Sequence, residues 1–387
     1  MWYFVAPDIV FGQGALQALD ELVGQRSLVI TDAALLGLGL VDRVTSRLTR
    51  AGLEVQVFDE VVSEPTVELV QIGVATAHEF EPDWIVGLGG GSPMDAAKAI
   101  WVLYERPDLE AGDINPFVDL RLRQKARLIT IPTTSGTGAE VTWGIVLTDP
   151  VEGRKMGLGN RENVADLAVV DPVMAAGMPP VLTADTGMDA LTHAFEGYTC
   201  TWHTDLTDGL CVKAARDIFQ YLPRAVQEGS DMEARERMHN AATCAGLGFG
   251  NAMASLAHAM GHALGAAFHV SHGRAVGIFL PYTIEFAVRQ SPIRFNELAD
   301  RLGLEAGSGE AGCRRLADRV RELARQVGSP TNVAEAGIDP EACEHRLEQL
   351  VDVAFNDTQI VTAPRSPTYD ELAQLFRCAF EGRDVDF

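Results

Sequence analysis

The stretch WIVGLGGGSPMDAAK, residues 84–98, reads as a buried strand that turns through three consecutive glycines into a helix. Pro93 suits the first turn of that helix. Glycines let the backbone approach a phosphate group closely, and the start of a helix offers N–H donors and the positive end of its dipole. The stretch therefore predicts either a phosphate-binding turn or only a tight connection between a strand and a helix.

The glycine pattern alone does not identify a nucleotide site. Gly87 and Gly89 fit the dinucleotide-binding pattern G-x-G-x-x-G, but Ser92 stands in the position of the third glycine. No acidic residue ends a following strand about 20 residues later, where such a site would hold the ribose.

A second loop, IPTTSGTGAEVT at residues 131–142, also follows a strand-like run. Its hydroxyl groups could hydrogen-bond a ribose or a pyrophosphate, or they could cap a helix. In open α/β sheets ligands gather at the carboxyl ends of the strands, so two such loops favour a nucleotide site more than one does.

Apolar strand-like runs alternate with helical patterns along the first half of the chain. Strands are expected at residues 27–32, 53–58, 84–88, 127–131 and 167–170, with helices at 40–51 and 67–80. After Met178-Pro179-Pro180 the spacing is helical, as at 205–222, 231–248, 294–302, 312–327 and 369–381. We therefore expect an α/β domain with a parallel sheet at residues 1–180 and an all-α domain at 181–387.

The composition limits the function classes. The 387 residues are 47% hydrophobic and carry a formal charge of -23, which disfavours a disordered chain and a nucleic-acid partner. No apolar run approaches the roughly 20 residues of a membrane span, and the start lacks a signal-peptide pattern. Six cysteines without a CxxC pair favour reduced thiols. We expect a cytoplasmic protein with no membrane partner.

Acidic and histidine residues form two pairs with helical spacing. Asp189 and His193 are four residues apart, as are His258 and His262, and His272 follows shortly. Both pairs lie among small apolar residues, and buried polar groups need partners. A shared divalent cation, Fe(II) or Zn(II) for this donor set, would satisfy them. The alternative is a group of hydrogen-bonded core histidines.

The glycine turn at residues 89–95, the loop at 131–142 and this set of acidic and histidine residues together resemble the iron-containing, group III alcohol dehydrogenases. Lactaldehyde reductase and 1,3-propanediol dehydrogenase belong to that family. The resemblance extends over essentially the whole chain. It implies the dehydroquinate synthase-like fold, with a dinucleotide-binding α/β domain followed by a helical domain that binds the metal and carries out catalysis.

The resemblance also implies different roles for the histidines, which their spacing does not distinguish. It implies that Asp189, His193, His258 and His272 bind the metal, Fe²⁺ or else Zn²⁺. It implies that His262 lies beside the nicotinamide as a catalytic residue that relays the alcohol proton. Spacing alone would instead favour His258 and His262 as a ligand pair.

For the cofactor, the resemblance implies NAD. Asp32 matches the position that reads the adenosine ribose, where a carboxylate accepts from the 2′-hydroxyl and repels a 2′-phosphate. The other implied contacts are Gly90, Gly91, Ser92, Asp95, Thr133, Thr134, Thr137, Thr142 and Lys155.

The expected reaction is a reversible oxidation of a primary alcohol to an aldehyde. The implied substrate pocket includes Trp143, Gly144 and Phe249. Family members that act on small hydroxylated aldehydes can carry a polar residue where this chain has Gly144, so a 2-hydroxyaldehyde is disfavoured.

The sequence is also compatible with other activities. Within the superfamily the alternatives are a glycerol or diol dehydrogenase, a dehydroquinate synthase-like lyase and a hydroxyacid-oxoacid transhydrogenase. From another class, the alternative is a nucleotide-binding activator without turnover of its own. A homodimer or a higher homo-oligomer is expected, because dimers are the commonest closed assembly.

Overall fold

The computed structural model describes residues 3–149, 154–304 and 309–387, and they divide into two compact units. The first unit runs to Thr134 and resumes at Gly138–Gly177, and the second comprises Ser135–Thr137 and Met178–Phe387. The short segment Ser135–Thr137 packs with the second unit although the chain around it belongs to the first.

The first unit is built on a six-stranded sheet in the order β1-β8-β5-β4-β2-β3, and every pairing in it is parallel. Its strands are β1 (Asp8–Phe11), β2 (Arg26–Ile30), β3 (Glu54–Phe58), β4 (Trp84–Gly89), β5 (Arg127–Pro132) and β8 (Leu167–Val170). A separate antiparallel hairpin joins β6 (Gly144–Asp149) to β7 (Arg154–Gly159).

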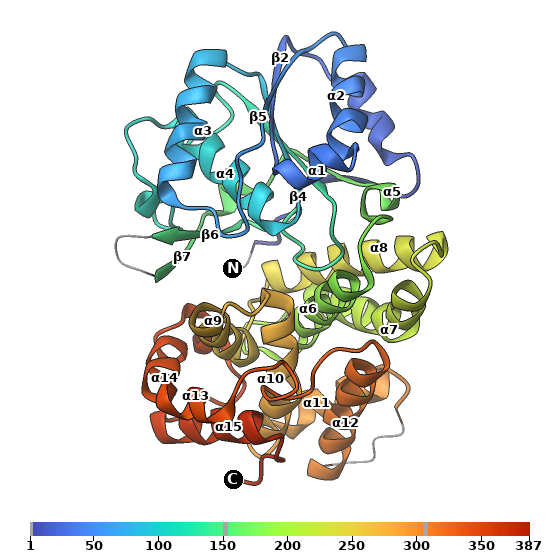
Figure 1. The fold of residues 1–387 in the computed structure, drawn as a ribbon, viewed down its shortest axis with the longest axis vertical. Coiled ribbons are helices and arrows are strands. Elements are labelled where there is room, and N and C mark those ends of the chain that lie inside the picture. The colour runs from blue at the N-terminus through green and yellow to red at the C-terminus, as the bar shows by residue number, and fades with distance from the viewer. Residues whose placement is uncertain (1–2, 150–153, 305–308) are drawn as a thin grey trace. The chain divides into compact units, whose positions relative to one another are not determined.

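Helices cover both faces of the parallel sheet (Figure 1). Successive strand side chains point to opposite faces, so Leu28 packs with α3 and α4 while Val29 packs with α1 and α2. The helical elements of this unit are η1 (Ala15–Glu21), α1 (Ala33–Gly37), α2 (Leu40–Arg50), α3 (Val67–Phe80), α4 (Gly91–Glu105), η2 (Ala111–Asp113), η3 (Arg161–Asn163) and α5 (Pro172–Ala175).

The strand order reverses between β2 and β4. From β2 the chain moves outward to β3 and then returns to the other side of β2 to form β4. Such a switch point leaves a crevice at the carboxyl ends of the two strands, where open α/β sheets bind ligands. Asp32 follows β2 and Gly90 follows β4, so both lie at this edge.

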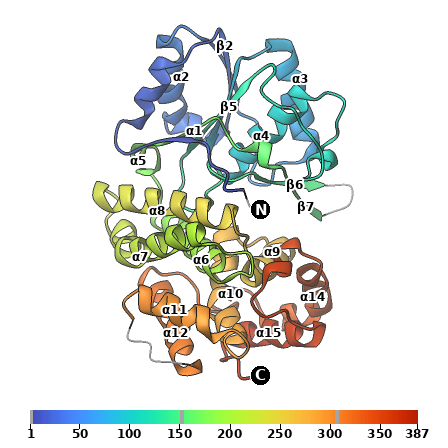
Figure 2. The same ribbon diagram turned by 180° about the vertical axis from the view of Figure 1, so that it is seen from behind.

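The second unit is all-helical in the residues that the structure describes (Figure 2). Its elements are α6 (Pro180–Thr199), α7 (Asp205–Gln227), α8 (Met232–Gly250), α9 (Leu256–Phe268), α10 (His272–Ala287), α11 (Pro292–Arg301), α12 (Glu310–Gln326), α13 (Pro340–His345), α14 (Leu347–Phe355), η4 (Thr358–Thr362) and α15 (Tyr369–Glu381). The predicted fold class, an α/β part followed by an all-α part, is confirmed.

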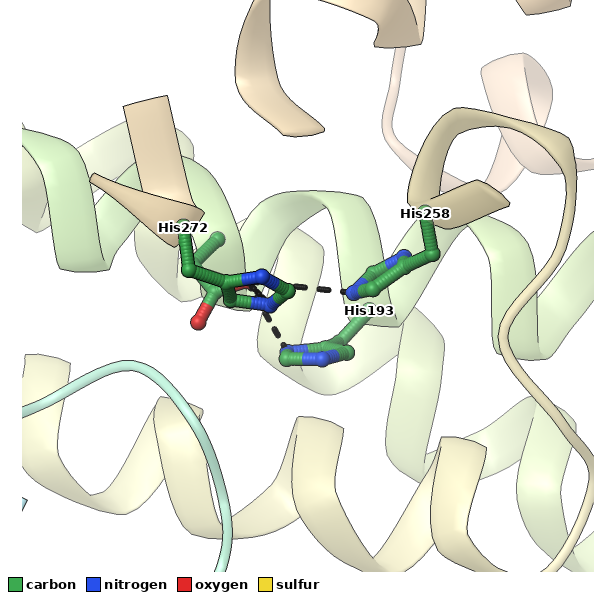
Figure 3. A group of neighbouring side chains, drawn as sticks. His193, His258 and His272 are labelled. Carbon is green, nitrogen blue, oxygen red and sulfur yellow. Dashed lines mark ion pairs between the residues drawn. The ribbon is translucent and has the colours of Figure 1, made fainter. Parts of the chain in front are cut away.

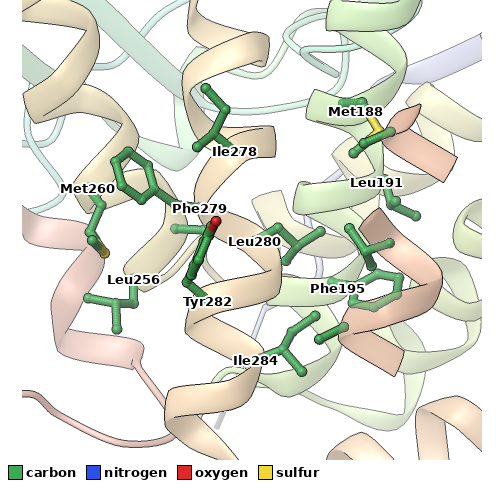
Figure 4. Close-up of a cluster of buried hydrophobic side chains, with 14 of the residues drawn as sticks. Met188, Leu191, Phe195, Leu256, Met260, Ile278, Phe279, Leu280, Tyr282 and Ile284 are labelled. Atoms are coloured by element: carbon green, nitrogen blue, oxygen red, sulfur yellow. The ribbon is translucent and has the colours of Figure 1, made fainter. Parts of the chain in front are cut away.

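A large apolar core joins α6, α9 and α10 (Figure 4). Burying one large apolar side chain contributes roughly 1.5–3 kcal/mol, so this cluster holds the three helices firmly together. The core residues drawn from these helices include Met188, Leu191, Phe195, Leu256, Met260, Ile278, Phe279, Leu280, Tyr282 and Ile284.

The five cysteines whose side chains are described are free thiols, and four of them are buried. No helix in the described residues is both long and apolar enough to cross a membrane.

Candidate metal centre

Helix α6 presents three ionisable side chains along one stripe. Asp189 and His193 are four residues apart and Glu196 follows three residues later, and all three are almost fully buried. Gly273 in the first turn of α10 packs against the same helix, because a Cβ there would lie 2.3 Å from the Asp185 carbonyl oxygen. This close approach brings the start of α10 to the stripe.

Four side chains from α6, α9 and α10 converge at this point (Figure 3). Oδ1 of Asp189 lies 3.7 Å from His193 Nδ1, 3.9 Å from His258 Nε2 and 3.5 Å from His272 Nε2. All four candidate ligand atoms lie within 4.8 Å of one another. In a tetrahedral site with bonds of about 2.1 Å, ligand atoms lie about 3.4 Å apart. The group therefore has nearly the dimensions of a metal site.

Three of the four candidate ligand atoms are buried and have no hydrogen-bond partner in the described part of the chain. They are Asp189 Oδ1, His193 Nδ1 and His258 Nε2. Burial raises the pKa of Asp189 to about 7 and lowers the pKa of His193 well below its ordinary value. Unpaired buried polar atoms are costly, and a shared cation would satisfy all three at once. One carboxylate with three imidazoles suits iron or zinc.

Two of the rings are held from behind by further groups. Nδ1 of His258 lies 2.5 Å from Oε2 of Glu196, and His193 hydrogen-bonds the backbone of Gly136. Since His193 Nδ1 has no hydrogen-bond partner, its other nitrogen makes that bond. Each ring is thus left with one nitrogen facing the group. Glu196 was not predicted from the sequence, although its position seven residues after Asp189 placed it on the same face of the helix.

His262 lies next to the four-residue group without belonging to it. Its ring centroid is 6.0 Å from that of His258 and 5.3 Å from that of His272. Its Nδ1 lies 2.7 Å from Oδ2 of Asp357, a half-buried carboxylate that also caps η4. Asp357 was not predicted as a partner of His262, because the two residues are 95 positions apart in the chain.

Phe249 is the expected pocket residue that the structure brings to this group. Its ring stacks on His193 with the centroids 3.9 Å apart and the planes 11° from parallel. Trp143 and Gly144 belong to the first compact unit.

The residues expected at the cofactor gather in the loops that follow β2, β4 and β5. Asp32 caps α1, because its Oδ1 accepts from the backbone N–H groups of Ala34 and Leu35 at 3.0 and 3.1 Å. Gly90 and Gly91 form the start of α4. Gly89 before them has a φ of +153°, and a Cβ on it would lie 2.5 Å from Pro93.

The loops after β4 and β5 lie side by side. The Thr133 N–H donates to the Gly89 carbonyl at 2.9 Å, and a Cβ on Gly90 would lie 3.5 Å from the Thr134 side chain. The hydroxyl of Ser92 donates to the Ser63 carbonyl at 2.6 Å.

The chain then enters the second unit. There Ser135 hydrogen-bonds the buried ring of His239 at 3.0 Å, and Gly136 packs so tightly that a Cβ would lie 2.6 Å from Thr186. Burial lowers the pKa of His239 to about 4, so this ring is neutral. These contacts explain why Thr137, an expected cofactor contact, groups with the helical unit.

Asp95, another expected cofactor contact, ties α4 to the hairpin. Its Oδ2 accepts from the Val146 N–H at 3.0 Å, and Oδ1 lies 3.5 Å from Nζ of the fully buried Lys98. Lys98 also donates to the Gly144 carbonyl at 2.9 Å.

Two further expected contacts lie on the hairpin or before it. Lys155 on β7 pairs with Glu64 at 3.0 Å, and Thr142 is buried just before β6.

Comparison with known proteins identifies the family. The family model for iron-containing alcohol dehydrogenase matches residues 6–172, and the model for the C-terminal part of the Fe-containing alcohol dehydrogenase family matches residues 183–380. The NADPH-dependent butanol dehydrogenase of Clostridium saccharobutylicum is 40% identical over 390 residues, which cover the full length of both chains.

Solved structures agree. A 1,3-propanediol oxidoreductase superposes with a TM-score of 0.93 at 31% identity, covering 98% of this chain and 100% of the other. Sulfoacetaldehyde reductase from Bifidobacterium kashiwanohense, solved in complex with NAD⁺, superposes with a TM-score of 0.87 at 27% identity, covering 98% of both chains. Two family models, a full-length relative and these structures lead to one conclusion: the chain belongs to the iron-containing alcohol dehydrogenase family.

Proposed function

We propose that this enzyme catalyses the reversible, NAD-linked oxidation of a primary alcohol to an aldehyde at a divalent metal held by Asp189, His193, His258 and His272. The observation that carries the proposal is the convergence of four ligand atoms within 4.8 Å, three of them buried without a hydrogen bond. A site that only stabilised the fold would pair these atoms with one another or with the backbone.

The metal, when bound, acts as a Lewis acid that polarises the substrate oxygen. Asp189 supplies the negative charge of the site, and the three imidazoles are neutral nitrogen ligands. His272 is the most exposed of the four, with 38% of its side chain accessible, so substrate is expected to approach from its side. Iron is the metal named for the family, and the same donors also accept zinc.

His262 is proposed to carry the alcohol proton. Asp357 accepts a hydrogen bond from Nδ1 of the ring, so Nε2 is the nitrogen that takes up or releases a proton. About a fifth of the His262 side chain is exposed, 22%, which leaves it a path for exchange with water. An imidazole suits this task near neutral pH.

NAD is proposed to bind at the carboxyl edge of the parallel sheet. The N–H groups at the start of α4 would hold the pyrophosphate, next to Gly90, Gly91 and Thr134. Oδ1 of Asp32 is used by the helix cap, whereas Oδ2 makes no hydrogen bond in the described residues and is free to accept from a ribose hydroxyl. The butanol dehydrogenase named above is NADPH-dependent, so the preference for NAD rests on the charge of Asp32.

The substrate is proposed to be an unbranched alcohol of about four carbons. Gly144 offers no hydrogen-bonding side chain, while Trp143 and Phe249 offer apolar surface, and each buried methylene adds roughly 0.8 kcal/mol. The relative that acts on butanol favours this class.

The enzyme is also proposed to be a cytoplasmic homodimer or higher homo-oligomer. Free thiols in the described cysteines support a reducing compartment, and closed symmetric dimers are the commonest assembly.

The proposal is tested with protein purified without air, analysed for metal and assayed with a panel of alcohols and NAD. We expect close to one iron or zinc ion per chain and NADH formation with primary alcohols. Metal-replete protein that binds NAD but forms no NADH with any alcohol would overturn the proposed function and favour a nucleotide-binding activator.

A further inference from the structure

We propose that Glu196 is a positioning residue that selects Nε2 of His258 as the metal-binding nitrogen and fixes the start of α9 beside the site. The inference rests on the proposed metal site and adds a fifth, non-ligating residue to it. It follows from the hydrogen bonds that this carboxylate accepts.

Glu196 accepts three hydrogen bonds, all from the first residues around α9. Oε2 accepts from the Ser255 N–H at 2.8 Å and from His258 Nδ1 at 2.5 Å, and Oε1 accepts from the Ala257 N–H at 2.6 Å. Ser255 is the N-cap residue of α9, but its own side chain makes no capping bond. Glu196 therefore caps α9 from a neighbouring helix, satisfying N–H groups that a helix start leaves without partners.

The same contacts decide which nitrogen of His258 carries the proton. An ionised carboxylate can only accept, so Nδ1 must hold the hydrogen and Nε2 keeps its lone pair. Nε2 is the atom that faces Asp189, and it has no hydrogen-bond partner in the described residues. Outer carboxylates commonly orient a metal-binding histidine in this way.

The stripe on α6 makes this arrangement rigid. Asp189 and His193 are candidate ligands on that stripe, and Glu196 orients a third ligand from one turn further along. Glu196 is only 4% exposed, and the helix around it is packed on all sides. One helix thus sets the position of three of the four ligands.

Glu196→Gln is the sharpest variant, because it keeps the shape but leaves one acceptor oxygen. If the oxygen faces Ser255 and His258, the amide NH₂ opposes the Ala257 N–H. If the oxygen faces Ala257, the NH₂ donates to Nδ1, and the hydrogen moves to Nε2, which then cannot bind metal. Either orientation weakens the site, and we expect the dissociation constant for Zn²⁺ to rise about 10- to 100-fold.

Thr199→Val is the matched control. Thr199 is buried on the same helix three residues later, and its hydroxyl donates to the Phe195 carbonyl at 2.8 Å. The control loses a buried hydrogen bond without touching a ligand, so its affinity for Zn²⁺ should match that of the wild type.

Two measurements read out the result. Competition with a chromophoric chelator gives the affinity for Zn²⁺, and thermal unfolding with and without Zn²⁺ gives the stabilisation by metal. If Glu196 had only a structural role, Glu196→Gln would lower the melting temperature equally with and without Zn²⁺. If Glu196 positions His258, the difference between these two melting temperatures becomes smaller than in the wild type. Glu196→Gln with wild-type affinity and an unchanged gap would overturn the inference.

A failure of the proposed metal site would look different, since the wild-type protein itself would then bind no Zn²⁺. A failure of the proposed activity alone would leave Zn²⁺ binding intact and abolish only NADH formation. Should Glu196→Gln not fold, Glu196→Asp replaces it. The shorter carboxylate cannot reach both backbone N–H groups and the ring together, so weaker Zn²⁺ binding is again expected. Unchanged affinity in Glu196→Asp would count against the inference.

Discussion

His258 and His262 show that residue type and helical spacing do not determine the role of a histidine. They are chemically identical and one turn apart on α9, so helical spacing treats them alike. In the structure their partners differ: His258 faces Asp189, while His262 bonds Asp357. Only the family resemblance predicted that His258, rather than His262, would converge with Asp189. The spacing of Glu196 from Asp189 on α6 offered a signal for the residue behind His258, whereas nothing pointed to Asp357. Partners such as Asp357 depend on tertiary packing between distant helices.

Alanine variants of these histidines should separate ligand from relay. His258→Ala and His272→Ala should lose metal and activity together, because the remaining buried donors no longer enclose a cation. His262→Ala should keep metal near the wild-type content and turn over more slowly. Elemental analysis of each variant gives its metal content. If His262→Ala contained no metal while His272→Ala kept it, the assignment of His272 as a ligand and His262 as the relay would be refuted.

The carboxylate of Asp32 is expected to set the cofactor preference. Asp32→Asn removes the charge but keeps the cap on α1, because asparagine caps helices as well as aspartate does. The ratio of kcat/KM for NADP to that for NAD should rise. Asp339→Asn, at the equivalent cap of α13, is the control and should leave the ratio unchanged. An unchanged ratio in Asp32→Asn as well would mean that Asp32 does not contact the ribose.

At the scale of elements, periodicity predicted the long regular segments well. The helix expected at 67–80 and the strand expected at 167–170 match α3 and β8 residue for residue. The hairpin β6–β7 and the edge strand β1 were missed. The hairpin contains Gly144, Gly157 and Gly159, which weaken a strand pattern, and β1 is short and largely exposed.

The β6–β7 hairpin is hydrogen-bonded by the buried ammonium of Lys98, a residue of α4 outside the hairpin's own sequence. Lys98→Met should destabilise the protein by about 3 kcal/mol, because it removes the cation that pairs with the partly buried carboxylate of Asp95. Burial already raises the pKa of Asp95, with Lys98 opposing that rise. Urea unfolding measures the effect. The double variant Asp95→Asn/Lys98→Met removes both charges and should recover part of the loss; no recovery would mean that packing dominates.

For the whole molecule, the order of elements along the chain was enough to predict an α/β unit followed by an all-α unit. The grouping of Ser135–Thr137 with the helical unit was not predictable, because it depends on the contacts with His239 and Thr186. The loop at residues 131–142, which is expected to contact the nucleotide, thus also contains Gly136, whose backbone hydrogen-bonds His193.

The intact enzyme should prefer butan-1-ol to propane-1,2-diol in kcat/KM. Against apolar side chains, each added methylene of the alcohol contributes roughly 0.8 kcal/mol to binding, whereas a second hydroxyl finds no hydrogen-bond partner. A homologous series from ethanol to hexan-1-ol, with the diol alongside, measures the preference. A strong preference for the diol would contradict the proposed pocket.

We propose that the four convergent side chains hold one catalytic metal ion. The most direct test strips the enzyme with a chelator and titrates Fe²⁺ back without air while NADH formation from butan-1-ol is followed. We expect no turnover in the stripped protein, and recovery that saturates at one ion per chain. Full activity in protein shown to be free of metal would contradict it.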